Sequence, residues 1–229
     1  MYFDSTYLIY VVPALLISLW ASVHVKSTFA RYNQIGNRRG YTGAQVARRI
    51  LDDNGLTGVR IERVSGSLTD HFDPSAGVIR LSDSTYSSTS VGAIGVAAHE
   101  CGHAVQYDVG YFPMQVSRAI IPLTQIGSSV AIPLAVIGII LGFSLLTEIG
   151  ILLFCAVVVF QLVTLPVEFN ASRRAMRTLE EDGILEDDEL RGARKVLTAA
   201  ALTYVAALLV SIGNLLRLLA LRDRRNGRR

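Results

Sequence analysis

The sequence predicts a mainly α-helical, multi-pass membrane protein with about four membrane helices and a small α+β domain in water. Hydrophobic residues make up 51% of the 229 residues, and they concentrate in residues 1–25, 119–167 and 197–220. The segments between these runs have ordinary mixed polarity, and they show the patterns of helices and of a β-hairpin. This division is typical of a set of membrane spans that carries one water-facing domain.

The first apolar run predicts a membrane anchor helix in residues 1–25. Residues 7–25 carry no charge before His24, and a run of about 19 residues is long enough for one span. A cleaved signal peptide is the alternative, but it requires a basic N-terminal region, which this sequence lacks. The basic residues that follow, from Lys26 to Arg39, indicate that the C-terminal end of this span lies in the cytoplasm.

Residues 119–167 predict a membrane hairpin of two helices. The stretch contains one charged residue, Glu148, and it is too long for a single span. We expect the tight turn at Thr147–Gly150. Pro122 and Pro133 indicate that the first leg is kinked or begins along the interface.

The hairpin returns the chain to the cytoplasm, so residues 168–196 should join residues 26–118 in one cytoplasmic domain. The last predicted element, residues 197–229, is a membrane or interfacial helix with a basic tail. Two alternatives stay open for it, because a fourth span would place the tail RDRRNGRR outside, against the positive-inside rule. These features together predict a multi-pass protein of the plasma membrane.

Helix and strand signals alternate in the cytoplasmic domain. Thr42 and Gln45 form a capping-box pattern ahead of an apolar helical repeat. Alternating residues at 59–63 predict a strand, and residues 68–81 predict a β-hairpin around the turn Pro74–Gly77. A second helix is expected to begin near Ser90 and to run past residue 107.

One face of this second helix has no bulky apolar residue. Its members are spaced by three and four positions, as on one side of a helix: Gly92, Gly95, His99, Gly102, His103 and Gln106. A core-facing stripe would carry leucine or isoleucine there. The small side chains therefore indicate a site that something approaches closely.

The segment His99-Glu100-Cys101-Gly102-His103 matches the HExxH pattern. On a helix, the two histidines project from the same side one turn apart, so both imidazoles can bind one zinc ion. Glu100 lies beside them, where it can deprotonate a zinc-activated water. We therefore expect one Zn²⁺ per chain, with Glu100 as the catalytic base.

A catalytic zinc needs a third protein ligand and one open position. His24 lies at the end of a span, and Cys101 faces away from the histidine pair by its spacing. Glu168 is the best candidate, since it follows an apolar span on the predicted cytoplasmic side; the alternative is a carboxylate at the protein surface. Ser172 lies one turn further on the same face, where it can form a hydrogen bond with a ligand.

These motifs together resemble the YugP-type membrane zinc metallopeptidases, and more distantly the HtpX and CAAX prenyl endopeptidases. The resemblance is carried by HExGH, by the segment Glu168-Phe169-x-Ala171-Ser172-Arg173-Arg174-Ala175, by Gly40–Ala44 and by Leu68–Pro74. It covers essentially the whole chain. One departure is Ser172, where the HtpX group has an aspartate.

The resemblance implies a small zincin-like domain of the gluzincin type, in which Glu168 completes the zinc site. It also implies an exposed edge strand that pairs with the substrate backbone, and Val78, Ile79, Arg80 and Leu81 fit that place. His71 and Tyr107 are the candidates for stabilising the oxyanion. A structural role for both is the alternative.

The sequence therefore predicts a membrane-bound zinc endopeptidase whose substrates are proteins or peptides at the lipid bilayer. A site-2-type intramembrane protease would need an aspartate within a later span, and these spans contain none. A proteolytically inactive zinc-binding protein or scaffold is the other alternative, but it would not need Glu100. Nucleic-acid binding is not expected, because the basic residues flank the apolar runs and form no separate stripe.

Overall fold

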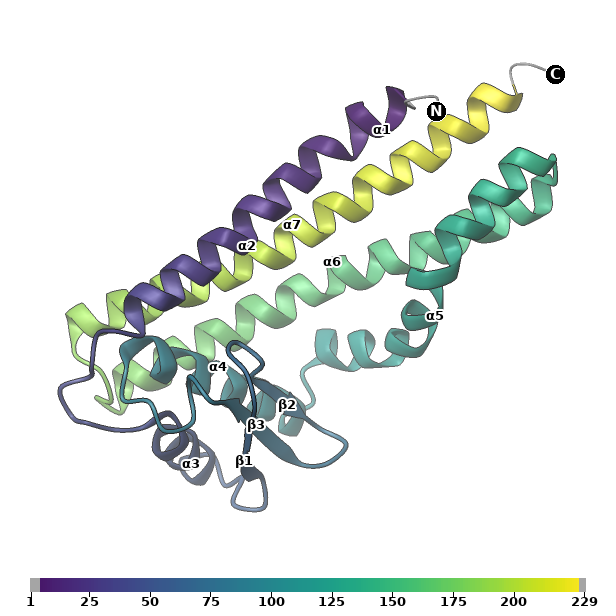
Figure 1. The fold of residues 1–229 in the computed structure, drawn as a ribbon. Coiled ribbons are helices and arrows are strands. Elements are labelled where there is room, and N and C mark those ends of the chain that lie inside the picture. The colour runs from purple at the N-terminus through teal and green to yellow at the C-terminus, as the bar shows by residue number, and fades with distance from the viewer. Residues whose placement is uncertain (1–4, 227–229) are drawn as a thin grey trace. The chain divides into compact units, whose positions relative to one another are not determined.

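The computed structural model describes residues 5–226. Its elements (Figure 1) are α1 (Ser5–Tyr10), α2 (Val12–Tyr32), α3 (Gly43–Asp53), β1 (Arg60–Val64), β2 (His71–Asp73), β3 (Val78–Ser82), α4 (Val91–Asp108), α5 (Phe112–Leu141), α6 (Ser144–Glu181) and α7 (Asp187–Asn226). Residues 1–4 and 227–229, the ends of the predicted anchor and of the basic tail, lie outside the described residues.

The chain divides into two compact units. The first, which we call the helical unit, combines the N-terminal residues up to Ser22 with Gln115–Leu165 and the residues from Leu202 onward. The second, the α/β unit, combines Val23–Met114 with Pro166–Ala201. Helices α2, α5, α6 and α7 each contribute to both units.

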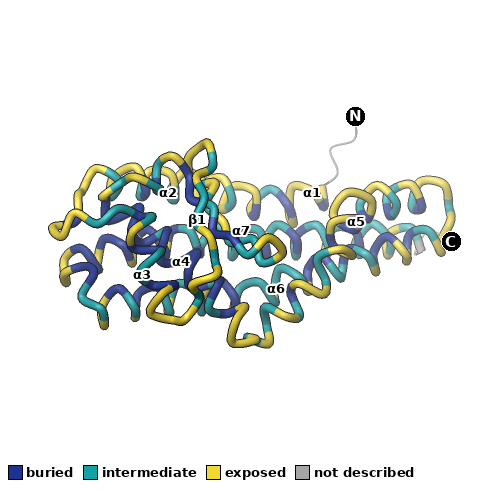
Figure 2. Tube along the Cα trace, turned by 90° about the horizontal axis from the view of Figure 1, so that it is seen from below, coloured by how far each residue is buried: buried dark blue, intermediate teal, exposed yellow. Residues whose placement is uncertain are grey.

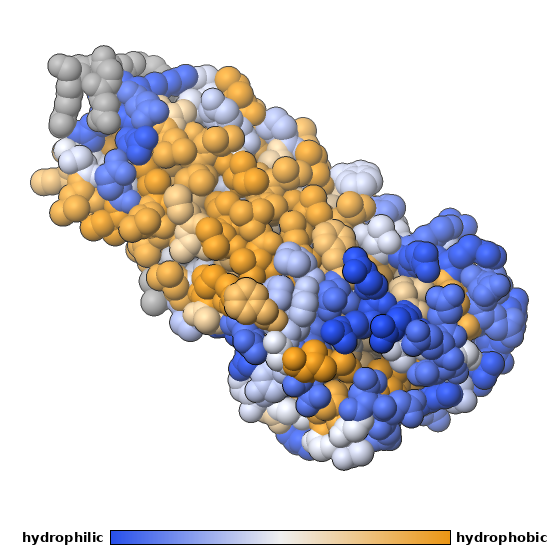
Figure 3. All heavy atoms as spheres, turned by 180° about the vertical axis from the view of Figure 1, so that it is seen from behind, coloured by the Kyte–Doolittle hydropathy of each residue, from blue (hydrophilic) through white to orange (hydrophobic). Residues whose placement is uncertain are grey.

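The helical unit has a small internal core and an apolar exterior. Ala131, Ala135, Phe154 and Leu218 are buried in this core. Large hydrophobic side chains are exposed around it, and Figure 3 shows the surface of these helices covered with hydrophobic residues. An apolar surface of this extent suits contact with lipid.

Three described helices are long and apolar enough to cross a membrane: Val12–Tyr32, Ser144–Glu181 and Asp187–Arg225. A fourth candidate consists of two helical pieces, Phe112–Gln125 and Gly127–Leu141, which meet at 48°. The expected kink in the first leg of the hairpin is therefore present. Among residues 5–226, the number of possible spans is three, or four if the bent pair forms one span.

The turn of the hairpin lies earlier than predicted. α5 ends at Leu141 and α6 begins at Ser144, so the proposed turn at Thr147–Gly150 is wrong. Gly142 adopts φ +91°, the left-handed conformation that ends helices. Gly150 has a packing role instead, because a Cβ there would lie 2.5 Å from the backbone nitrogen of Ala135.

Helix α4 is the centre of the α/β unit, and it is buried along most of its length (Figure 2). Its apolar side packs against α3, β3, α6 and α7 in one core. The largest fully buried residues of this core include Leu51, Ile79, Ile94 and Leu179. α4 is therefore held from several sides, which gives a rigid support to the residues on its small-residue face.

The helix starts and the hairpin of this unit confirm the sequence signals. Thr42 and Gln45 form both hydrogen bonds of a capping box at α3. Ser90 caps α4, because its hydroxyl accepts the N–H of Ala93 at 3.1 Å. β2 and β3 form the predicted antiparallel hairpin.

The position of β3 corrects one expectation. The sheet has the order β1-β3-β2, so Val78, Ile79, Arg80 and Leu81 lie on the central strand. β3 pairs in parallel with β1 and antiparallel with β2, which leaves no free edge for a substrate strand. The family resemblance implied an edge strand here, whereas the apolar residues of β3 are buried between two neighbouring strands.

Candidate metal centre

His99, His103 and Glu168 converge on one point of the α/β unit. The Nε2 atoms of the two histidines are 3.1 Å apart. Glu168 Oε2 lies 3.2 Å from His99 Nε2 and 3.6 Å from His103 Nε2. α4 supplies the imidazoles one turn apart, and α6 supplies the carboxylate. The structure thus brings a carboxylate from a distant part of the sequence to a histidine pair within one helix.

The spacing of these three atoms fits a tetrahedral zinc ion. Zinc with bonds of about 2.0–2.1 Å separates neighbouring ligand atoms by roughly 3.3 Å, and the observed separations are 3.1, 3.2 and 3.6 Å. Two imidazoles and one carboxylate are also a known ligand set of catalytic zinc, with the fourth position left for water or substrate. The donors therefore fit the metal in both number and chemistry.

Hydrogen bonds on the far side of each imidazole orient the rings. Ser172 Oγ lies 3.1 Å from His99 Nδ1, and Gln106 Oε1 lies 3.0 Å from His103 Nδ1. When each Nδ1–H donates to these oxygens, the lone pair of Nε2 points to the metal position. Such outer partners fix the tautomer and the orientation of histidine ligands.

A network of hydrogen bonds behind His103 determines the orientation of the Gln106 side chain. Arg174 has donors only, so its Nε at 2.9 Å from Asn170 identifies the Asn170 atom as the oxygen. Gln106 Nε2 donates to this oxygen at 3.0 Å and to the Val167 carbonyl at 2.8 Å. The remaining oxygen of Gln106 must therefore face His103 Nδ1, as an acceptor.

The helical spacing of the sequence predicts Gln106 on the metal-facing side of α4, but neither its role nor the contribution of Asn170 is evident from the sequence. Gln106 is fully buried (0% exposed). The available signal was its position three residues after His103, which puts it on the same helix face. The contribution of Asn170 depends on how α6 crosses α4, which spacing alone does not determine.

Glycine at position 102 allows α6 to approach α4. A Cβ at Gly102 would lie 2.6 Å from the carbonyl oxygen of Ala171, closer than two such atoms can come without movement of the backbone. Ala171 lies between Glu168 and Ser172, which both contact His99. The small residues on this face of α4 therefore accommodate the helix that brings the third ligand.

Glu100 is buried beside the histidines, with 8% of its surface exposed. Burial raises the pKa of its carboxyl, although the neighbouring His99 and His103 partly oppose this change. A carboxylate with a raised pKa is a stronger base than a solvated one, and general bases work best when their pKa approaches the working pH. Glu100 thus has the environment that a catalytic base requires.

The two proposed oxyanion residues have other contacts in the structure. His71 is exposed on β2, where its Nδ1 lies 2.9 Å from the Thr69 carbonyl and its Nε2 lies 3.4 Å from Arg80. Tyr107, at the end of α4, packs its ring 6.0 Å from the ring of Phe72. These contacts do not include the three convergent ligand atoms, and a catalytic role for either residue stays a prediction.

Loss of the Gln106 oxygen should weaken metal binding. We expect Gln106→Leu to reduce zinc affinity by about 10- to 100-fold, because His103 loses the acceptor that orients it. Gln34→Leu, the same change at an exposed position, is the control and should leave affinity unchanged. Competition with a chromophoric chelator measures both variants. Equal affinities for the two would show that the network does not support the metal site.

Two glycines of α4 allow a matched test of whether the close packing of α6 against α4 supports the metal site. Gly102→Ala should reduce zinc affinity by roughly tenfold or more, since α6 must move and the ligands must lie within about 0.5 Å of their working geometry. Gly95→Ala is the control, because the atom nearest to its Cβ would be the Ala193 Cβ at 3.2 Å, a less severe approach than 2.6 Å to a backbone oxygen. Both changes favour the helix equally. If both variants bind zinc alike, close packing at Gly102 is irrelevant to the site.

Zinc binding should depend on pH through His103. Burial disfavours the charged imidazole, but its hydrogen bond to Glu168 and the charges of Glu100 and Glu168 outweigh this, so its pKa is raised in the metal-free protein. The bound proton must leave when a metal binds. Zinc affinity should therefore rise with pH until the raised pKa is passed, by up to about tenfold per pH unit for each proton displaced. Titrations corrected for the chelator's own protonation test this, and a flat profile would contradict it.

Comparison with known proteins agrees with this geometry. Residues 7–223 match a family described as "Putative neutral zinc metallopeptidase". The curated protein "Putative membrane protease YugP" of Bacillus subtilis (strain 168) is 49% identical over 206 residues, which cover 90% of this chain and 92% of that protein. No solved structure matches the chain. The resemblance read from the sequence motifs is thereby confirmed: the chain belongs to this family of neutral zinc metallopeptidases.

Proposed function

We propose that the protein is a membrane-bound, zinc-dependent endopeptidase of the gluzincin type, which hydrolyses membrane or membrane-proximal proteins. One observation carries the proposal: His99 Nε2, His103 Nε2 and Glu168 Oε2 lie within 4.8 Å of one another, and the buried Glu100 follows directly after one of these ligands. A site that only stores zinc has no use for a buried base at this position.

The residues have distinct roles in the proposed reaction. The three ligands would hold a zinc ion, and the bound ion would supply polarisation of the scissile carbonyl and a lowered pKa for a water molecule. Glu100 takes the proton of the attacking water and then gives it to the leaving amine. Ser172 and Gln106 keep the imidazoles in place during these steps. His71 and Tyr107 remain the candidates for a hydrogen bond to the developing oxyanion.

β2 is the strand that can accept an extended substrate. It is one of the two edges of the sheet, and it contacts α4, whereas the other edge, β1, contacts α3. An extended peptide can add to a free edge through main-chain hydrogen bonds. The Phe72 side chain packs on Tyr107, which links this strand to the end of the metal-binding helix.

The position of Glu168 favours substrates near the bilayer. α6 continues without interruption from an apolar stretch that suits a membrane span to Glu168, which follows Leu165 within one turn. The cations flanking the apolar runs favour the cytoplasmic side for the site. The proposed location is therefore the cytoplasmic face of the plasma membrane.

Metal removal tests the activity. The detergent-purified protein should cleave members of a membrane-protein panel, lose this activity with a chelator and regain it when one equivalent of Zn²⁺ is added. Two substrates with the same cleavable segment, one next to a transmembrane helix and one behind a long linker, test the location. Cleavage that persists after full removal of the metal would refute the proposed function.

A further inference from the structure

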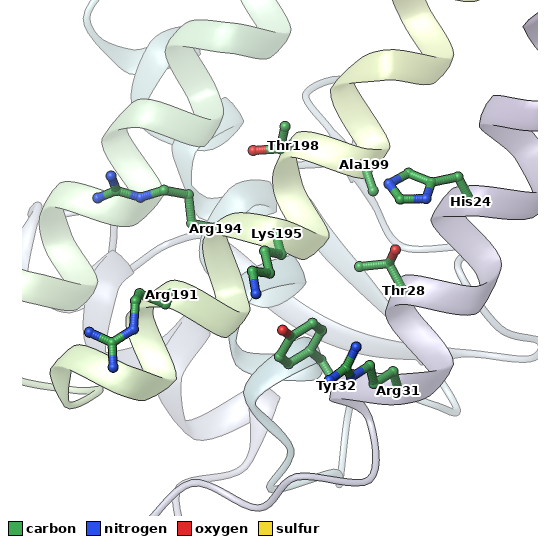
Figure 4. A pocket seen from close by; sticks show the side chains of 9 residues that line it. All are labelled: His24, Thr28, Arg31, Tyr32, Arg191, Arg194, Lys195, Thr198 and Ala199. Atoms are coloured by element: carbon green, nitrogen blue, oxygen red, sulfur yellow. The ribbon is translucent and has the colours of Figure 1, made fainter.

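A basic pocket lies between the end of α2 and the beginning of α7, among residues of the α/β unit that the metal centre does not use. Its volume is about 470 Å³. Arg31 of α2 and Arg191, Arg194 and Lys195 of α7 line it (Figure 4). Arg194 and Lys195 follow Arg191 by three and four residues, so each lies next to Arg191 on the helix surface.

These cations have no acidic partner within the described part of the chain, because no carboxylate there lies at ion-pair distance from any of them. Two of the three acids at the start of α7, Asp188 and Glu189, bind Arg38. The third, Asp187, forms no ion pair with the pocket cations among the described residues. Both oxygens of Asp188 accept hydrogen bonds from Arg38 at 2.8 Å, and Glu189 accepts the backbone N–H of Arg38 at 2.7 Å. The positive charge of the pocket is therefore left for an external anion.

Tyr32 gives the pocket a defined wall. Its ring centre lies 5.8 Å from the Arg31 guanidinium carbon and 6.0 Å from Lys195 Nζ. Gly192 leaves room for the ring, because a Cβ there would lie 2.8 Å from Tyr32 Cδ1. The ring is thus held between the two helices, and cations on both helices contact it. A wholly solvated charged surface would not need this arrangement.

Two arginines of the pocket lie at the end away from the apolar runs. Arg31, Arg191 and Tyr32 lie at one end, and His24, Thr198 and Ala199 lie at the other (Figure 4). Along both helices, α2 and α7, the second group lies on the side of the apolar runs that suit membrane spans. A ligand that extends from the arginines toward the apolar runs would have an anionic head and an apolar remainder.

We propose that this pocket binds the phosphate of an anionic phospholipid headgroup. Arginine suits phosphate because its planar guanidinium offers parallel hydrogen bonds to two phosphate oxygens. Basic pockets between membrane helices on the cytoplasmic side bind anionic lipid headgroups in the same way. The inference does not depend on peptidase activity, since binding can be measured whether or not the protein cleaves anything.

Native mass spectrometry of the detergent-purified full chain tests the proposal. The protein is titrated separately with phosphatidylglycerol, with phosphatidylcholine and with inorganic phosphate. The pocket variant is Arg191→Gln/Lys195→Gln. The control is Lys26→Gln/Arg177→Gln, which likewise removes one lysine and one arginine, but at positions outside the pocket lining.

We expect one phosphatidylglycerol to bind in preference to phosphatidylcholine, and its affinity to fall about tenfold or more in the pocket variant while the control keeps it. Three results would each overturn the proposal. These are equal loss in both double variants, equal binding of the two lipids, and saturation by inorganic phosphate at the same concentration as by the anionic lipid. The last result would assign the pocket to a soluble anion.

Discussion

Replacement of Glu100 by glutamine should abolish proteolysis and leave the metal in place. The amide keeps the size of the carboxylate but cannot take a proton from water, and loss of a general base typically lowers kcat by about 10²- to 10⁴-fold. Zinc content should stay near one per chain, because Glu100 is not among the convergent ligand atoms. Turnover on a membrane-protein substrate and metal analysis of the same sample measure both effects.

Glu180→Gln provides the control for this experiment. Glu180 is an exposed glutamate on α6, so the same chemical change there should alter neither turnover nor zinc content. Undiminished cleavage by Glu100→Gln would rule out Glu100 as the base. Loss of both zinc and activity would show that Glu100 acts on the metal site and would leave the base unidentified.

Replacement of Glu168 by alanine should strongly reduce the affinity for zinc. Glu168→Ala removes the only ligand that α6 supplies and leaves two imidazoles to bind zinc, so we expect affinity to fall by at least about 100-fold. The buried site would also lose the carboxylate that balances the positive charge of the metal. Competition with a chelator of known affinity measures this loss in the purified protein.

Glu180→Ala serves as the matched variant on the same helix, three turns further on, and it should bind zinc like the unmodified protein. Far-ultraviolet circular dichroism of both variants shows whether the helices are retained. A Glu168→Ala protein that is folded and still holds zinc at full affinity would mean that the third ligand lies elsewhere.

Local signals in the sequence predicted the elements that carry the site. Thr42, Ser90 and the HExxH spacing are short-range patterns, and each depends only on hydrogen bonds or side-chain directions within one helix. The same holds for the β2–β3 hairpin, whose turn residues identify it. Glu168 was found because a single carboxylate follows a long apolar run, which limits the choices.

Long-range packing determined what the sequence did not reveal. Gly150 and Gly142 look alike in sequence, yet one permits close helix packing and the other ends a helix. β3 is the central strand because β1 pairs with it. The alternation of apolar and polar residues within β1 does not specify which strand β1 pairs with. The roles of Gln106 and Asn170 could not be predicted, because their hydrogen bond forms only where α4 crosses α6.

Zinc K-edge X-ray absorption of the purified protein reports the atoms bound to the metal, and it therefore tests whether His99, His103 and Glu168 are the ligands. We expect two imidazole nitrogens and oxygen ligands at about 2.0–2.1 Å, and loss of this environment in Glu168→Ala. A sulfur ligand at about 2.3 Å, or a shell with fewer than two imidazoles, would contradict the convergence of His99, His103 and Glu168 on one zinc ion.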